Sequence, residues 1–240
     1  MNMPIPRLFT RIHMPSERDI PLFLLRFYVI GALGFMLPVL RPLFKMLTPF
    51  ALLMCFALVL FYELTTTRKR GMSHFLIFIG VVYLISLLAE IVGVNTGVLF
   101  GPYKYGNGLG IKIWHTPLMI GINWILVTLG AAAISQRMST LLGFAETRYV
   151  GAVFRIVVAS FLMIMLDFLL ERIAPWMDMW SWLTVRVPGR NYLVWLLLSI
   201  CFQTYYVAGK IQQRTHVAAV LFLLQALFFL ALLLFIRYIY

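Results

Sequence analysis

The sequence is poor in charged residues. Only 12% of its 240 residues are Asp, Glu, Lys or Arg, and only eight are acidic, whereas a soluble domain has about 25% charged residues. Hydrophobic residues make up 62%, and runs of about 20 apolar residues recur along most of the chain, which is typical of polytopic helical membrane proteins. A transmembrane barrel would instead alternate over segments of about 10 residues. We therefore predict an all-α polytopic membrane protein, a bundle of about seven transmembrane helices.

The predicted spans leave little room for a separate soluble domain. We therefore treat residues 1–240 as one integral-membrane domain with a polar N-terminal segment at 1–20. The spans are predicted at 21–40, 47–64, 74–94, 117–135, 151–170, 191–209 and 217–237. The first two are separated only by RPLFK, which predicts a tight helical hairpin. Two connecting segments, 95–116 and 172–190, are long and rich in aromatic residues, unlike ordinary short polar connectors.

Several residue patterns that would signal a cofactor are missing. The four His are scattered, without the paired spacing of a di-iron or zinc site. There are only three Asp and no aspartate-rich cluster for a magnesium-bound diphosphate. The last span has no Lys, so it cannot form a retinal Schiff base. We predict no metal and no cofactor, which leaves acid–base chemistry on an apolar molecule, or binding without chemistry.

Cysteine and net charge exclude two further classes. Cys55 and Cys201 each lie inside an apolar run, so we expect two small core residues rather than a disulfide or a metal site. The net charge of +12 comes from 20 Lys and Arg residues that are spread over the loops. Such loop charges follow membrane topology and contact anionic headgroups. We therefore predict the lipid bilayer as a partner, and no nucleic acid.

Polar groups gather toward one face of the predicted bundle. Consecutive spans run in opposite directions, so the end of every odd span and the start of every even span share a face. Glu90 lies near the end of the third span, and Asp167 and Glu171 lie at the end of the fifth. Residues four apart point to the same side of a helix. Both long loops start at this face, and we expect them to fold over a site.

Carboxyl groups at membrane depth are the strongest candidates for chemistry, because burying them is costly and they usually mark function. Glu90, Asp167 and Glu171 are our candidate catalytic residues. The alternatives are structural: Glu90 could accept hydrogen bonds from loop amides, and Glu171 could pair with Arg172. Removing a carboxyl group from water favours its protonated form. Such a group can donate its proton as a general acid.

Other polar and aromatic residues near this face are candidates for substrate binding. His115 could act as a base or a hydrogen-bond donor, although a lone histidine at the interface is more often structural. The aromatic residues could form an interfacial belt, or turn inward, where their π faces would stabilise a carbocation. The candidate binding residues are Tyr103, Tyr105, His115, Asn123, Trp124, Trp180, Trp182, Asn191 and Trp195.

Two blocks of sequence resemble a known family. The stretch EIVGVNTGVLFGPYKYGNGLGIKIWHTPLMIGINW is similar to a signature of the bacterial and archaeal carotenoid biosynthesis proteins that include bisanhydrobacterioruberin hydratase and the γ-carotene 1′-hydratases. A second block, MLDFLLERIAPWMDMWSWLTVRVPGRNYLVWL, also resembles this family, so the likeness covers roughly residues 75–200. The chain departs from the family pattern at Arg172, where proline is common, and at Val194, where glycine is common.

The resemblance implies hydration of an acyclic (ψ) carotenoid end group, with a carotenoid as the hydrophobic substrate. Water would add across the terminal 1,2 double bond and leave a tertiary hydroxyl. Either Glu90 or Asp167 would protonate C2, and the other carboxyl group, with Glu171, would position the water or take its proton. Asn191, Tyr103 and Tyr105 would orient water or line the pocket. The resemblance also implies a multi-pass protein of a bacterial or archaeal cell membrane, with other carotenoid enzymes as candidate partners.

Two other functions remain open from the sequence. A carotenoid end-group cyclase would use the same acid and aromatic residues, but its cation would be attacked by a neighbouring double bond. A carotenoid carrier or scaffold would bind the pigment without chemistry. A hydratase adds 18 mass units per end group, whereas a cyclase leaves the mass unchanged. In every case a long apolar molecule is expected to enter sideways from the bilayer.

Overall fold

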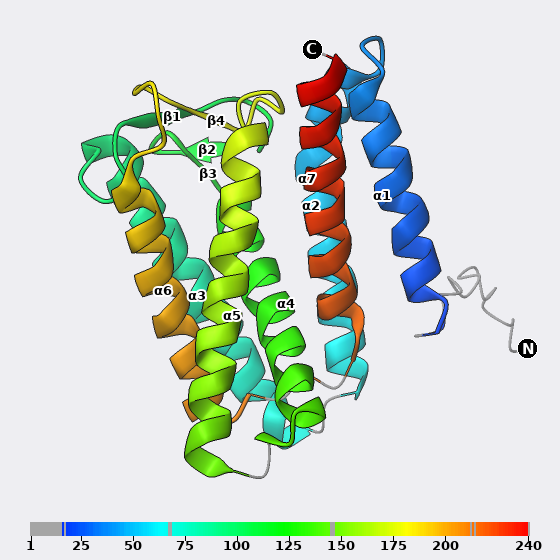
Figure 1. The fold of residues 1–240 in the computed structure, drawn as a ribbon, viewed down its shortest axis with the longest axis vertical. Helices are drawn as coiled ribbons and strands as arrows, with labels where there is room; N and C mark the ends of the chain where they lie inside the picture. Colours follow the sequence, from blue (N-terminus) through cyan, green and yellow to red (C-terminus); the bar gives the residue numbers. More distant parts are fainter. Residues whose placement is uncertain are drawn as a thin grey trace, which may run out of the picture.

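The computed structural model describes residues 16, 18–66, 69–144, 147–211, 213 and 215–239. Most of the predicted polar segment, residues 1–15 and 17, lies outside the described residues. Within the described ranges the chain forms seven α-helices, which confirms the predicted all-α class (Figure 1). They are α1 (Ile20–Met36), α2 (Arg41–Thr66), α3 (Lys69–Thr96), α4 (Met119–Leu141), α5 (Arg148–Ile173), α6 (Gly189–Ala208) and α7 (Val217–Ile239).

Six of the described helices, α2 to α7, are long and apolar enough to cross a membrane, so the chain is an integral multi-pass membrane protein. Helix α1 is apolar but has only 17 residues. At 1.5 Å per residue it is about 25 Å long, which is short of the roughly 30 Å hydrocarbon core. Seven helices were predicted, but α1 does not reach the length of a full span.

The boundary between α1 and α2 differs from the prediction. The first span was expected to continue to residue 40, but α1 ends at Met36, and Leu37 is extended, with φ −80° and ψ 116°. Leu37 precedes Pro38, and a residue before proline is sterically disfavoured in the helical region. RPLFK is therefore the first turn of α2 rather than a connector. Pro42 is tolerated there because backbone N–H groups of a first turn have no intrahelical partner.

Helix α4 is the centre of the bundle. It packs against α2, α3, α5, α6 and α7, and 83% of its apolar 18-residue stretch is buried inside the bundle. Helices α3, α5 and α6 lie on one side of it and α1, α2 and α7 on the other (Figure 1). A Cβ atom at Gly130 would lie only 2.6 Å from the Cβ atom of Phe222 on α7. Small residues at such contacts let membrane helices approach closely.

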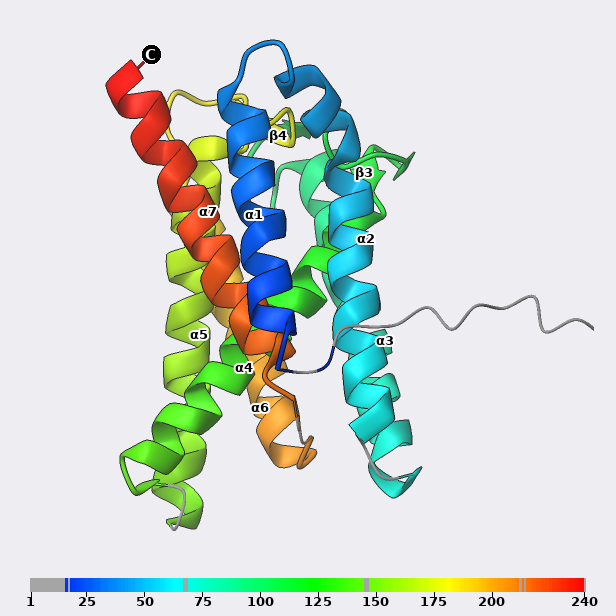
Figure 2. The same cartoon turned by 90° about the vertical axis from the view of Figure 1, so that its right-hand side faces the viewer.

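Two short antiparallel ribbons form in the long loops at one end of the bundle. Strand β1 (Tyr103–Tyr105), from the first loop, pairs with β4 (Trp180–Trp182), from the second. Strand β2 (Lys112–Ile113) pairs with β3 (Thr116–Pro117) within the first loop. These strands were not predicted, although the two loops were expected at the same face. Figures 1 and 2 show both loops above the same end of α3 to α6.

Asp178 joins the two loops beside the β1–β4 ribbon. Its carboxylate oxygen Oδ2 accepts a hydrogen bond of 3.1 Å from the backbone N–H of Asn107. Its backbone carbonyl accepts one of 2.7 Å from the N–H of Gly108. The N–H of Gly106 donates to the carbonyl of Met179 at 2.9 Å. Five residues from two distant loops are therefore held in one compact contact.

Gly106→Ala is expected to loosen this contact. An added Cβ would lie 2.4 Å from the carbonyl oxygen of Asp178, a backbone atom that cannot rotate away. Overpacking of this kind costs about 1–3 kcal/mol, so thermal unfolding of the purified protein should begin at a lower temperature. Gly80→Ala is the matched control, because nothing lies within 4 Å of its added Cβ. Equal melting temperatures for the two variants would contradict a tight packing of the loops.

The two cysteines differ in their surroundings. Cys55 on α2 is buried, as predicted, whereas Cys201 on α6 is exposed on the outside of the bundle, and both are free thiols. The prediction that Cys201 is a core residue was wrong. Because the outer surface of a membrane protein faces lipid, an apolar residue suits it as well as it suits the core.

Candidate active site

The β1–β4 ribbon presents four aromatic side chains to the bundle. Tyr103 lies opposite Trp182, and Tyr105 lies opposite Trp180. Alternate residues of a strand point to the same face, so both tyrosines and both tryptophans share one face of the ribbon. The tyrosines reach a carboxyl group on α3, and the tryptophans reach one on α5. A repeat of two in YKY and WSW is the sequence signal for this arrangement.

Glu90 lies under the tyrosine half of the ribbon and is almost fully buried, with 4% of its surface exposed. The hydroxyl groups of Tyr103 and Tyr105 each donate a hydrogen bond of 2.6 Å to its Oε2 atom. The indole N–H of Trp124, on α4, donates to Oε1 at 3.1 Å. Three donors and no acceptor surround this carboxyl group, an arrangement that stabilises a carboxylate.

Glu171 has an equivalent set of partners under the tryptophan half. The indole N–H groups of Trp180 and Trp182 both donate to its Oε2 atom. The side-chain amide of Asn191, on α6, donates to Oε1 at 3.1 Å. The alternative that Glu171 forms an ion pair with Arg172 does not hold in this structure, because the Arg172 guanidinium donates to the carbonyl of Phe168 and stacks on its ring.

Asp167 lies one turn below Glu171 on the same face of α5 and is fully buried. The same Asn191 nitrogen that bonds Glu171 also donates to its Oδ2 atom, at 3.1 Å. Its other oxygen, Oδ1, is buried and has no hydrogen-bond partner. Buried polar atoms are normally paired. Asp167 therefore has unused hydrogen-bonding capacity, whereas each oxygen of Glu90 and Glu171 has a donor.

No positive side chain balances these carboxyl groups. Within the described parts of the chain, Glu90, Asp167 and Glu171 contact only phenol, indole and amide donors. Nor do any three described His, Cys, Asp or Glu side chains form a group that could hold a metal ion. Like charges that share an apolar region disfavour full ionisation of all members.

The two tyrosines keep their protons in this setting. Burial under the ribbon raises the pKa of Tyr103 and Tyr105 above the ordinary value of 10, and the nearby charge of Glu90 raises it further. A raised pKa means that the neutral phenol persists to more alkaline pH. Both hydroxyl groups therefore remain hydrogen-bond donors to Glu90 throughout the physiological range.

A small cavity separates Glu90 from Glu171. Its volume is about 20 Å³, and a site of roughly 10–15 Å³ can hold one water molecule. The Trp195 ring, which lines it, stacks on Trp124 with ring centres 3.8 Å apart. The walls are Glu90, Phe100, Tyr103, Tyr105, Ile120, Glu171, Trp180, Trp182, Asn191 and Trp195. Phe100 and Ile120 were not among the predicted site residues, although both lie within the first sequence block.

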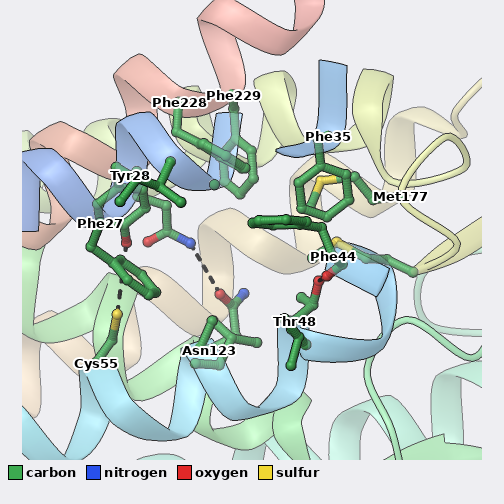
Figure 3. A pocket seen from close by; sticks show the side chains of 17 residues that line it. Phe27, Tyr28, Phe35, Phe44, Thr48, Cys55, Asn123, Met177, Phe228 and Phe229 are labelled. Carbon is green, nitrogen blue, oxygen red and sulfur yellow. Dashed lines mark hydrogen bonds between the residues drawn. The ribbon is translucent and has the colours of Figure 1, made fainter. Parts of the chain in front are cut away.

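Two of the predicted binding residues lie elsewhere. His115 is exposed in the first loop, where its Nδ1 atom is 3.0 Å from the side-chain oxygen of Asn95. Asn123 precedes Trp124 on α4, but it lines a second cavity between α1, α2, α4 and α7 (Figure 3). The other predicted residues are brought together around the carboxyl groups. The sequence did not reveal Gln225, which lines the second cavity; its signal is a single amide within an apolar span.

Comparison with protein-family models gives a match. A family model described as carotenoid biosynthesis protein matches residues 47–239, which is most of the chain. This range contains all the residues of the site between α3, α4, α5 and α6, and it begins within α2. No curated protein and no solved structure matches the chain.

Proposed function

Because the chain belongs to the carotenoid biosynthesis protein family, we propose that it is a carotenoid 1,2-hydratase. It would add water to the terminal double bond of an acyclic end group by acid–base catalysis, in the cell membrane of a bacterium or archaeon. One observation carries the proposal: a cavity that fits one water molecule lies between two carboxyl groups with aromatic walls. A cyclase has no need of a water site.

The proton comes from Asp167 in this proposal. Three neighbouring carboxyl groups without a cation are stable in an apolar region only if at least one holds a proton. Glu90 and Glu171 each accept three hydrogen bonds, which favours their ionised forms. Asp167 accepts one, and its Oδ1 atom has no partner. It is therefore the group best suited to remain protonated. Because Asp167 does not line the closed cavity, it would act as the general acid once the site has opened around the substrate.

The proposed reaction runs through a tertiary carbocation. Asp167 transfers its proton to C2, the less substituted carbon, and the π electrons of the double bond form the new C–H bond. The cation at C1 is stabilised by the negative charges of Glu90 and Glu171 and by the aromatic faces of the ribbon. The water oxygen bonds to C1, and Glu90 takes the proton that the water loses. Return of that proton to Asp167 completes the cycle.

The substrate end group cannot fit in the cavity as it stands, because 20 Å³ is about the size of one water molecule. Binding therefore requires the β1–β4 ribbon and the helices beneath it to separate. The hydrogen bonds from the ribbon to Glu90 and Glu171 would hold it closed in the absence of substrate. Closure over the bound end group would then exclude all but the reacting water.

Expression in cells that accumulate lycopene or γ-carotene tests the proposal directly. The extracted pigment is expected to gain 18 mass units per modified end group, measured by chromatography and mass spectrometry against cells that lack the gene. The hydrated pigment should also elute as a more polar compound. A new pigment of unchanged mass would identify a cyclase instead. No new pigment, together with purified protein that retains coloured carotenoid, would favour a carrier or scaffold.

A further inference from the structure

A second, larger cavity lies on another face of α4. Its volume is about 180 Å³, and it is lined by helices α1, α2, α4 and α7 and by Met177 and Met179 of the loop that follows α5 (Figure 3). Aromatic side chains make up much of its wall, among them Phe27, Phe44 and Phe228. Two further lining residues, Ile30 and Leu47, are 60% and 40% exposed on the outside of the bundle. The cavity therefore reaches the lipid-facing surface between α1 and α2.

Two amide side chains meet in this apolar cavity. The amide nitrogen of Gln225, on α7, donates to the side-chain oxygen of Asn123, on α4, at 3.4 Å (Figure 3). Asn123 is 5% exposed and Gln225 is 6% exposed. After this one bond, the Asn123 amino group and the Gln225 carbonyl oxygen have no partner among the described residues. If both amides were rotated, the pair would still leave one amino group and one carbonyl oxygen.

The unpaired groups define the chemistry of a ligand. A hydroxyl group both donates and accepts, so one alcohol could accept from Asn123 and donate to Gln225. The rest of the ligand must be apolar, because the remaining wall is almost entirely hydrocarbon and aromatic. A pure hydrocarbon would leave both amide groups unpaired, which is unfavourable in a dry site. A ketone would pair with the amino group alone.

We propose that this cavity binds a hydroxylated isoprenoid end group, with its hydroxyl on the Asn123–Gln225 pair. The choice of an isoprenoid alcohol rests on the proposed function, whose product carries a tertiary hydroxyl at the end of an apolar chain. The site is separate from the carboxyl groups. The side chains of the neighbouring residues Asn123 and Trp124 project from α4 in directions about 100° apart, because an α-helix has 3.6 residues per turn. The opening beside Ile30 and Leu47 connects it to the bilayer, where such a molecule dissolves.

Photo-crosslinking of the full chain in lipid nanodiscs tests this site. The probe is 2,6-dimethyloctan-2-ol that carries a small diazirine, and labelled peptides are identified by mass spectrometry. Labels are expected on the residues that line the cavity, on α1, α2 and α7 and on Met177 and Met179 of the second long loop. Unlabelled 2,6-dimethyloctan-2-ol should compete at a concentration about tenfold lower than 2,6-dimethyloctane, since only the alcohol satisfies the amide pair. Equal competition by the hydrocarbon would overturn the proposal and indicate a plain lipid site.

Variants separate the polar recognition from the shape of the cavity. The double variant Asn123→Leu with Gln225→Leu should abolish the preference for the alcohol while the hydrocarbon still competes. Ala51→Phe, which fills the cavity from α2, should abolish labelling there. Leu227→Ala, on the outer face of α7 with 59% exposure, is the control and should change nothing. Labelling elsewhere on the protein, or an unchanged preference in the double variant, would contradict the proposal.

The outcome is independent of the catalytic experiment. Glu90→Gln protein should still bind the probe in this cavity. Hydrated pigment without alcohol-selective labelling would disprove the second site and leave the hydratase intact. Alcohol-selective labelling without any hydrated pigment would support the second site and count against the hydratase.

Discussion

Glu90→Gln is expected to lower the rate of end-group hydration by about 10²–10⁴-fold, the usual contribution of a general acid or base. Glutamine keeps the size of the side chain but removes its negative charge and its ability to take a proton from water. Two phenol donors and one indole donor would then face a neutral amide instead of a carboxylate. The rate is measured as hydrated pigment formed per molecule of enzyme in membranes of defined pigment content.

The control for this prediction is a second buried carboxyl group. Glu63 is as deeply buried as Glu90, but it lies near the C-terminal end of α2, at the opposite end of the bundle from the site (Figure 1), where it accepts a 2.6 Å hydrogen bond from the Thr215 hydroxyl. Glu63→Gln should lower stability and leave the rate per folded molecule near that of the wild type. A wild-type rate in Glu90→Gln, or an equal loss in both variants, would show that Glu90 has a structural role only.

The sequence contained enough information to predict which carboxyl groups lie together. Alternation of span direction placed Glu90, Asp167 and Glu171 at one face, and helical spacing placed the last two on one side of α5. Both arguments depend only on the alternating direction of consecutive helices and on the period of a helix. They hold even though α1 ends four residues earlier than predicted, because the order and direction of the helices do not change.

The partners of those carboxyl groups could not be predicted in the same way. The β1–β4 ribbon joins residues about 80 positions apart in the chain, and nothing local in either loop specifies its partner strand. The direction in which Asn123 points depends on which helices surround α4, since neighbouring helical positions face different elements. Short strands and helix rotation are tertiary properties, so the sequence led us to group Asn123 with the residues around the carboxyl groups and to miss Gln225.

The three carboxyl groups are a source of instability that the fold compensates. Seven hydrogen bonds from phenol, indole and amide donors converge on Glu90, Asp167 and Glu171. Such bonds offset part of the cost of burying charge without introducing a cation. A cation would neutralise the site and oppose a positive intermediate. Neutral donors leave the site negative, which is the electrostatic environment that a carbocation requires.

Asp167→Asn is expected to abolish most of the hydration activity and to leave thermal stability equal or higher. The carboxamide cannot serve as an acid, so the rate should fall by about 10²–10⁴-fold. The change also removes a carboxyl group from a cluster without cations, and its amide oxygen can still accept from Asn191. Sites that are arranged for chemistry are commonly not optimal for stability. Asp167→Glu, which restores an acid in a shifted position, should recover part of the rate.

Ser160→Ala, on the same helix as Asp167, separates the effect on stability from the effect on the hydration rate. Ser160 is 2% exposed, and its hydroxyl oxygen, like Oδ1 of Asp167, is buried without a hydrogen-bond partner. Removing an unpaired buried hydroxyl should raise the melting temperature slightly and leave the hydration rate unchanged. If Asp167→Asn behaves in the same way, with higher stability and full activity, Asp167 is not the proton donor. If activity falls while stability rises, the loss cannot come from unfolding, and partial recovery in Asp167→Glu would assign it to the missing acid.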